Sequence, residues 1–250
     1  MTSMTADEAQ TTILAALATG FTELKLTGEL SKIGMGGNWG TFINNKKITK
    51  CDLTGVTGWG RTPTLPELAF MNCTALQEVT LPDDVRVIGS SAFFGCAALT
   101  TVNLSQVTWI NLNAFYECTS LEMLILDNVT EIGREVFYGC TSLKTLKIPK
   151  CTRFGNYIVT GCKALTRIEA TATGDFLDII GNSSIENYAV FHNRDTHSGE
   201  NAFAPARCDL VLNTDKQEDG TAVPKVSGNN RWTLAANASP MMWKNITFRQ

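Results

Sequence analysis

The chain has 250 residues, of which 44% are hydrophobic and 18% charged, an ordinary globular composition with enough apolar side chains for a sizeable core. The formal net charge of −3 provides no basic field that would favour nucleic acid as a partner. No run of 18 or more apolar residues is present, so we expect no membrane-spanning helix, and residues 1–10 lack the basic and apolar regions of a signal peptide.

A short helix is predicted near the start of the chain. Thr5 and Glu8 have the spacing of a capping box, in which each side chain bonds to the other residue's backbone N–H. Ile13 and Leu17 follow at helical spacing, and Gly20 is suited to end the helix. We therefore expect residues 1–20 to form an amphipathic N-terminal capping helix over the open end of the structure that follows.

Residues 21–170 carry an internal repeat of 22–23 residues, which is clearest over 67–169. Apolar residues recur in several aligned columns, and the same columns are present in weaker form upstream of residue 67. Two columns form the predicted inward ladders, Phe70, Phe93, Phe115 and Phe137, and Cys73, Cys96, Cys118, Cys140 and Cys162.

Each repeat unit has two halves with different periods. From Ile88 to Leu99 the apolar spacing follows one face of a helical segment, and from Leu99 to Leu104 the run ends in the alternation of a strand. One unit cannot bury its apolar side alone, whereas a stack of units can. We therefore predict an α/β repeat fold, a right-handed solenoid with one parallel concave sheet and with short helices or 3-10 turns on the convex side.

Insertions and the C-terminal part interrupt this pattern. In the weak upstream coil we match Val56, Trp59 and Gly60 to the columns of Val85, Ile88 and Gly89, and we interpret residues 61–66 as a loop that follows them. Another insertion at 35–40 is rich in glycine. Residues 171–250 are interpreted as an irregular, diverged repeat with a strand at 208–212 and a C-terminal cap. The residues available to seal that end are Trp243, Ile246 and Phe248.

At this point the repeat resembles a known family. Residues 88–99 are similar to the I-G-x-x-A-F-x-x-C-x-x-L signature of BspA-like leucine-rich repeats, and residues 132–143 match it with Val136 in place of alanine. Leu81-Pro82 and Ile148-Pro149 resemble the family's strand ends, and 243–245 resembles its C-terminal W-K-N. The resemblance implies a bacterial surface or secreted protein, several relatives of which are adhesins. It therefore implies an extracellular or cell-surface location and, as partner, a protein or glycan on a host or neighbouring cell.

No catalytic or metal-binding pattern stands out in the sequence. The ladder cysteines are interpreted as buried thiols, with disulfides between adjacent coils as the alternative, and the absence of C-x-x-C pairs argues against a zinc site. The only histidines, His192 and His197, lie in the irregular segment. We predict no enzyme, no cofactor and no metal. The alternative is a protein that binds or acts on polysaccharide through loops at 171–200 or 213–231.

The candidate binding residues lie in two rows of outward-facing positions on the predicted strands. Glu23, Lys50 and Glu78 alternate in charge and Lys25 faces Asp52, which predicts cross-strand ion pairs and leaves Asp52 and Glu78 as the one adjacent carboxylate pair. Near the middle of the rows an apolar pair with a polar rim predicts a contact site, whereas scattered exposed apolar residues, as in a passive spacer, are the alternative. The predicted site comprises Met123 and Ile125, flanked by Glu78, Thr80, Thr101, Asn103, Thr145 and Lys147.

Overall fold

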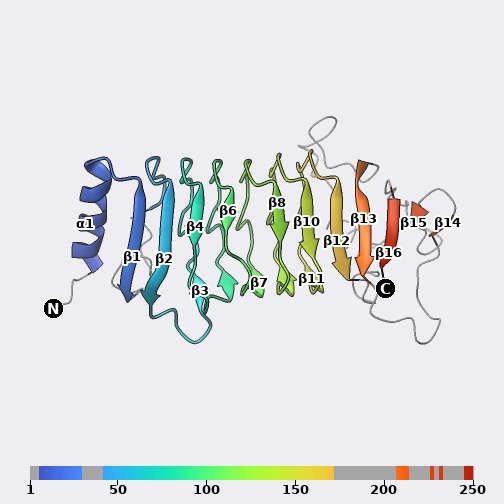
Figure 1. The fold of residues 1–250 in the computed structure, drawn as a ribbon, viewed down its shortest axis with the longest axis horizontal. Helices are drawn as coiled ribbons and strands as arrows, with labels where there is room; N and C mark the ends of the chain where they lie inside the picture. The colour runs from blue at the N-terminus through green and yellow to red at the C-terminus, as the bar shows by residue number, and fades with distance from the viewer. Residues whose placement is uncertain are drawn as a thin grey trace.

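The computed structural model describes residues 6–29, 42–171, 207–213, 226–227, 231–232 and 245–249. Figure 1 shows a straight row of coils with helix α1 (Ala6–Ala18) at one end, beside strand β1 (Glu23–Glu29). The predicted insertion at 35–40, the two histidines and Trp243 lie outside the described residues. In the described part of the chain, no helix has both the length and the apolar character that crossing a membrane requires.

One side of the coils is formed by parallel strands, and we name this side, predicted as the concave face, the strand face. It holds two sheets instead of the one continuous sheet that the repeat predicts. The first has the order β1, β2 (Lys50–Thr57), β4 (Glu78–Thr80) and β6 (Thr101–Val102). The second has the order β8 (Met123–Ile125), β10 (Thr145–Ile148), β12 (Arg167–Thr171), β13 (Asp209–Asn213) and β16 (Asn245–Arg249). Apart from these sheets, β14 (Val226–Ser227) and β15 (Arg231–Trp232) form a small antiparallel pair.

Within each sheet the register is the predicted one. Lys50 pairs with Glu23 on one side and with Glu78 on the other, and Thr145 lies opposite Met123. Each coil therefore adds one rung to the outward rows. Because β6 and β8 belong to different sheets, the rows are interrupted between Thr101 and Met123. The right-handed sense of the coil stays a prediction.

A third parallel sheet, which we name the edge sheet, runs along the lower edge of the coils in Figure 1, and it is unbroken. Its strands are β3 (Thr64–Leu65), β5 (Val87–Ile88), β7 (Trp109–Ile110), β9 (Glu131–Ile132) and β11 (Arg153–Phe154). This sheet corrects the interpretation of residues 61–66 as a loop, because Leu65 pairs with Ile88. Leu65, and not Trp59, therefore occupies the Ile88 column, and the insertion precedes β3.

The remaining side, the turn face, consists of single turns with the i→i−3 bond of a 3-10 turn and not of the predicted short helices. In residues 91–96 every second N–H donates to the carbonyl three residues earlier in its own coil. The N–H groups between them donate to carbonyls of the next coil. The donors to the next coil are Ser91, Phe93 and Gly95, which reach the carbonyls of Leu112, Ala114 and Tyr116 at 2.9, 2.8 and 2.7 Å. A helix would direct all of these donors into its own coil and leave none to join the coils. Ser91 and Gly95 have positive φ, which turns alternate peptides toward the neighbouring coil.

Two stacked ladders fill the interior. The rings of Phe70, Phe93 and Phe115 stack at centroid distances of 5.6 and 5.1 Å, and all three side chains are fully buried. Each ladder cysteine donates its S–H to the phenylalanine carbonyl of the preceding coil, as Cys118 does to Phe93 at 3.1 Å. A cysteine suits this column because it is a small apolar side chain that still donates a hydrogen bond.

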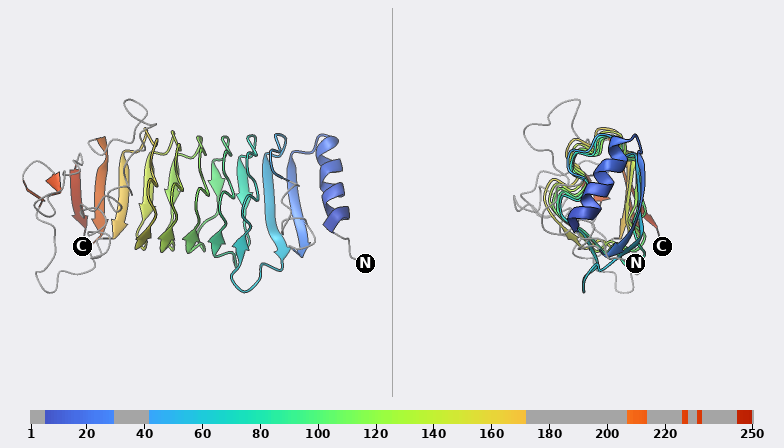
Figure 2. Two further views of the ribbon diagram at one scale, coloured as in Figure 1. Left: turned by 180° about the vertical axis from the view of Figure 1, so that it is seen from behind. Right: turned by 90° about the vertical axis from the view of Figure 1, so that its left-hand side faces the viewer.

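The glycine of the repeat signature is required by the close approach of coils. A Cβ on Gly133 would lie 2.6 Å from the backbone nitrogen of Leu112, and a Cβ on Gly89 would lie 2.5 Å from the carbonyl oxygen of Leu65. No side chain fits there without shifting backbone. The end-on view in Figure 2 shows the resulting superposition of the coils, with α1 lying across the end of the stack. Ile13 and Leu17 of α1 are buried in the common core.

Candidate functional site

The predicted apolar pair lies at the break in the strand face. Met123 is 60% exposed and Ile125 is 47% exposed, and both point outward from β8. Beside them a cavity of about 210 Å³ opens between β6 and β8, and we name it the slot. Its lining residues are Thr100, Thr101, Val102, Leu104, Leu121, Met123, Leu124 and Ile125.

The slot exists because the main-chain ladder is interrupted. In the next coil the N–H of Lys144 donates to the carbonyl of Glu122 at 2.8 Å, and the N–H of Leu126 donates to that of Lys147 at 2.9 Å. Within the described range 42–171 the equivalent bonds across the break, from Glu122 to Thr100 and from Leu104 to Ile125, are not formed. The slot therefore presents main-chain polar groups together with apolar side chains.

Asn103 lies next to this break and is exposed, as an outward position should be, but its side-chain amide also bonds to the main chain of the neighbouring coil. Its side-chain oxygen accepts a hydrogen bond from the N–H of Leu81 at 2.6 Å, and its side-chain nitrogen donates to the Leu81 carbonyl at 2.9 Å. The Asn103 side-chain oxygen thus accepts the N–H of Leu81 in the way that the main-chain carbonyl of Lys147 accepts the N–H of Leu126. As a result β6 pairs with β4 only at Thr101 and Val102, and the chain beyond Val102 is separated from the regular ladder.

The interior of the slot is apolar. Leu104 and Leu124 are buried, and Val102, which points inward, is only partly buried because the slot exposes it. Insertion of a whole strand would need about 9.6 Å between β6 and β8, twice the usual strand spacing. In the same coils the strands β5, β7 and β9 of the edge sheet stay hydrogen-bonded in register, so the coils are not that far apart. The slot therefore suits a side chain of a partner and not an added strand.

The other predicted residues divide between the slot and its surroundings. Thr101 lines the slot, whereas Thr145 lies one rung further on and does not. Lys147 forms an ion pair with Asp127 at 3.5 Å. Glu78 and Thr80 line a different cavity on the same face. The structure thus brings Thr101, Met123 and Ile125 together and places the remaining five around them.

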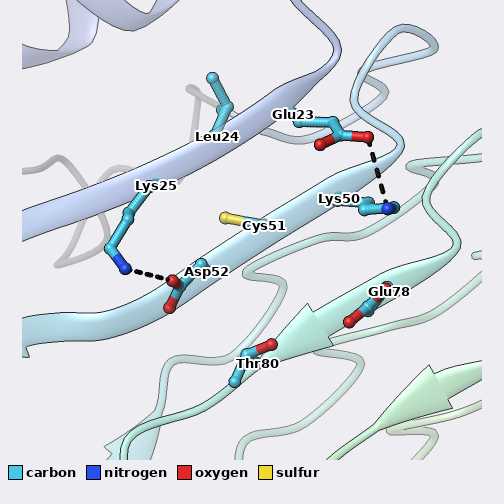
Figure 3. A pocket seen from close by; sticks show the side chains of 8 residues that line it. All are labelled: Glu23, Leu24, Lys25, Lys50, Cys51, Asp52, Glu78 and Thr80. Carbon is cyan, nitrogen blue, oxygen red and sulfur yellow. Dashed lines mark ion pairs between the residues drawn. The ribbon is translucent and has the colours of Figure 1, made fainter.

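The second cavity, of about 350 Å³, lies over β1, β2 and β4 and is charged. Figure 3 shows its two ion pairs, Lys25 with Asp52 at 2.9 Å and Lys50 with Glu23 at 3.4 Å, both as the sequence predicts. Glu78 lies on β4 beside these pairs. Within the described residues the structure assigns it no ion-pair partner.

The adjacent carboxylates of this cavity, Asp52 and Glu78, are poorly suited to acid–base chemistry because Asp52 cannot serve as the proton donor. The hydroxyl and the N–H of Thr54 both donate to Asp52, at 2.6 and 2.9 Å. These bonds, together with the Lys25 ammonium, lower the pKa of Asp52 to about 2. A carboxyl that ionises there is deprotonated at neutral pH and cannot act as a proton donor.

Cations on the strand face are neutralised in the same manner. Lys144 pairs with Glu122 at 2.9 Å and Arg167 with Glu169 at 2.6 Å, in addition to the pairs of Lys25, Lys50 and Lys147. The described part of the chain contains no group of three or more His, Cys, Asp or Glu side chains placed to hold a metal ion.

Two further features were not singled out in the sequence. Phe94, Tyr116 and Tyr138 stack along the turn face at centroid distances of 4.6 and 4.3 Å, and their 22-residue spacing could have revealed this outer ladder. Burial, and then the neighbouring Tyr138, raises the pKa of the Tyr116 hydroxyl. Away from the strand face, Trp109 and Leu112 are 38% and 43% exposed.

The eight cysteines are free and buried, so the predicted ladder thiols are not linked to one another. Burial raises the pKa of Cys73 and Cys140 to about 12 and that of Cys118 well above its usual range. Because the thiolate is the reactive form, these side chains are chemically inert at neutral pH.

Parallel strands in register, inward ladders and a 22-residue period define a leucine-rich repeat protein. The chain belongs to the BspA-type leucine-rich repeat family, whose model matches six copies over residues 41–166. No curated relative matches the chain.

Solved structures of bacterial proteins are similar to it. One is the T. pallidum leucine-rich repeat protein, with 23% identity, a TM-score of 0.46 and coverage of 67% of this chain and 66% of that one. Another is a leucine-rich cell surface protein from Faecalibacterium prausnitzii, with 28% identity, a TM-score of 0.40 and coverage of 52% and 41%. A third is the pneumococcal vaccine antigen PcpA, with 16% identity, a TM-score of 0.48 and coverage of 92% and 42%. The chain thus spans less than two thirds of each of these proteins.

Proposed function

We propose that this chain is an extracytoplasmic, non-enzymatic binding scaffold that engages a protein or glycan on a host or neighbouring cell through the slot on its strand face. The observation that carries the proposal is the exposure of Met123 and Ile125 at the mouth of a cavity with an apolar interior. An apolar spot with a polar rim is the composition of a protein contact site. The location at the cell surface and the role in adhesion are part of this proposal, and membership of the family supports them.

The energetics favour a small contact centred on this pair. Burying one large apolar side chain contributes about 1.5–3 kcal/mol, so Met123 and Ile125 supply most of the binding free energy available on this part of the face. The repeat holds both on one short strand, which limits the ordering cost on binding. The paired charges around them contribute orientation more than affinity.

The test is a pull-down of host extracellular matrix and mucin with the wild-type chain and with the double variant Met123→Asp, Ile125→Asp. Two buried carboxylates at the centre of the contact should abolish capture. The matched control is Leu112→Asp, which places the same charge on an apolar residue of similar exposure away from the strand face. Capture that survives in a folded double variant contradicts the proposal.

The second candidate is a passive spacer or self-association module, which the exposed apolar residues also allow. Light scattering of the wild-type chain separates the two. An oligomer that the double variant dissociates supports self-association, whereas a monomer that captures a ligand supports the binding scaffold.

A further inference from the structure

Glu78 and the slot lie on the same face, the strand face. Together they restrict the chemical class of the partner more than the slot does alone. We propose that the occupant is an extended segment of another protein that places an apolar side chain in the slot and a Lys or Arg side chain against Glu78. This inference rests on the proposed function and names the partner class of the same site.

The slot selects an apolar side chain attached to a peptide backbone. Its interior is formed by Leu104, Leu124 and the partly exposed Val102, whose side chains form no hydrogen bond with a charged or hydroxylated group. At its mouth the N–H of Glu122 and the carbonyl of Thr100 lack the main-chain bond that the next coil makes. A polypeptide supplies an N–H and a carbonyl beside every side chain and can pair with both.

Glu78 supplies the complementary charge. It is the carboxylate of the second cavity for which the described residues provide no ion-pair partner, since Lys50 is held by Glu23 and Lys25 by Asp52. On the side of the slot its neighbour in register is Thr101, which is neutral. A cation arriving from the slot side therefore meets Glu78 without displacing an existing pair.

The spacing of these two features sets the spacing of the partner's residues. Glu78 and Met123 are two rungs apart, on the order of 10 Å at about 4.8 Å per rung. A segment in the polyproline II conformation advances about 3.1 Å per residue and returns to the same face every third residue, so the basic residue lies three positions from the apolar one. Such a segment crosses the strands and runs along the row of coils.

A glycan fits this face less well. In the described strands the outward rows of the strand face contain no aromatic side chain on which a sugar ring could stack. The aromatic ladder of Phe94, Tyr116 and Tyr138 belongs to the turn face, and its rings already stack on one another.

The experiment uses the full chain and four twelve-residue Gly/Ser peptides as probes. One peptide carries Leu and Lys three positions apart, one carries Leu alone, one carries Lys alone, and one carries Leu with Glu in place of Lys. Binding is followed by NMR titration of the Met123 and Ile125 methyl groups, which reports affinity at the slot itself. We expect the Leu–Lys peptide to bind most tightly. Loss of Leu should weaken binding at least about tenfold, and loss of Lys about two- to fivefold.

Glu78→Gln should remove the advantage of the Leu–Lys peptide over the Leu peptide and leave the Leu peptide unchanged. Glu67→Gln is the matched control, because Glu67 is an exposed carboxylate away from the strand face, and it should change neither affinity. Raising the salt concentration should reduce the contribution of Lys and not that of Leu.

The possible failures are distinguishable. Equal affinity of the Leu–Lys and Leu peptides, or methyl groups that respond to no peptide, overturns the inference, and the proposed function still stands if matrix or mucin capture needs Met123 and Ile125. If that capture also ignores the double variant, both fail. A dimer that the double variant dissociates makes the occupant a second copy of this chain and overturns the inference as well.

Discussion

The turn face and the strand face of the same coils show opposite behaviour between residues 91 and 125. On the turn face Ser91, Phe93 and Gly95 each donate to the next coil, and the ladder is continuous. On the strand face the strands β6 and β8 are not joined by main-chain bonds. The turn face is fixed by buried ladder residues, whereas the outward positions of the strands pack against nothing. The repeat can therefore accept an irregularity on the strand face and not on the turn face.

Removing a rung of the inner ladder should have the largest effect on stability. Phe115→Ala leaves a cavity between the rings of Phe93 and Phe137 and should lower the free energy of unfolding by about 3–5 kcal/mol. Urea denaturation measures it. Phe21→Ala, at a residue that is 64% exposed, is the control and should cost less than about 0.5 kcal/mol. A loss below about 1 kcal/mol for Phe115→Ala would contradict the ladder.

The closed turn face and the open slot should also differ in thiol reactivity. The native cysteines should resist Ellman's reagent at pH 8, because burial raises the pKa of thiols such as Cys118 and also excludes the reagent. A cysteine introduced by Val102→Cys lies in the slot and should react at least about 10³-fold faster than the native thiols. All eight native thiols should react after unfolding in guanidinium chloride. Similar rates for the introduced and native thiols in the folded state would mean that the slot is closed.

Asn103 should control whether the strand face is broken. Asn103→Val removes the amide that bonds to Leu81, lets β6 continue beside β4 and should close the slot. A β-branched residue is also favoured in a strand, so we expect stability to stay equal or rise by up to about 1 kcal/mol while capture by the slot is lost. Thermal unfolding and the pull-down measure the two effects. A loss of more than about 1 kcal/mol would show that the amide is a required part of the fold.

The smallest expected effect concerns Asp52, on a rung where the strand face is intact. The pKa of this carboxyl is lowered to about 2, mainly by the Thr54 hydroxyl, so its hydrogen bonds stabilise the fold above about pH 4 and are lost as the pH falls toward 2. NMR titration of the Asp52 carboxyl carbon should show this low value, and Thr54→Ala should raise it. A titration near pH 4 in the wild-type chain would remove this account of the second cavity.

The sequence predicts the inward columns because the core must be apolar in every coil, whatever the outward residues are. Outward residues carry less information. Asn103 has the pattern of an ordinary polar strand residue, and only the positions of the coils show that its amide bonds to Leu81. Trp59-Gly60 has the same apolar-glycine pattern as the Ile-Gly of the signature, although it does not occupy that column. Only the pairing of Leu65 with Ile88 shows that the insertion lies before β3. The slot could not be predicted, since it arises where a ladder fails and not from any motif.

Amide hydrogen exchange in the free chain tests the break in the strand face most directly. The N–H groups of Glu122 and Leu104 make no main-chain bond across the break, while those of Lys144 and Leu126, one coil further on, are bonded in the intact ladder. We predict rapid exchange at Glu122 and Leu104 and protection at Lys144 and Leu126. Equal protection at all four would mean that the strand face is one continuous sheet, and the slot and the partner proposed for it would both be contradicted.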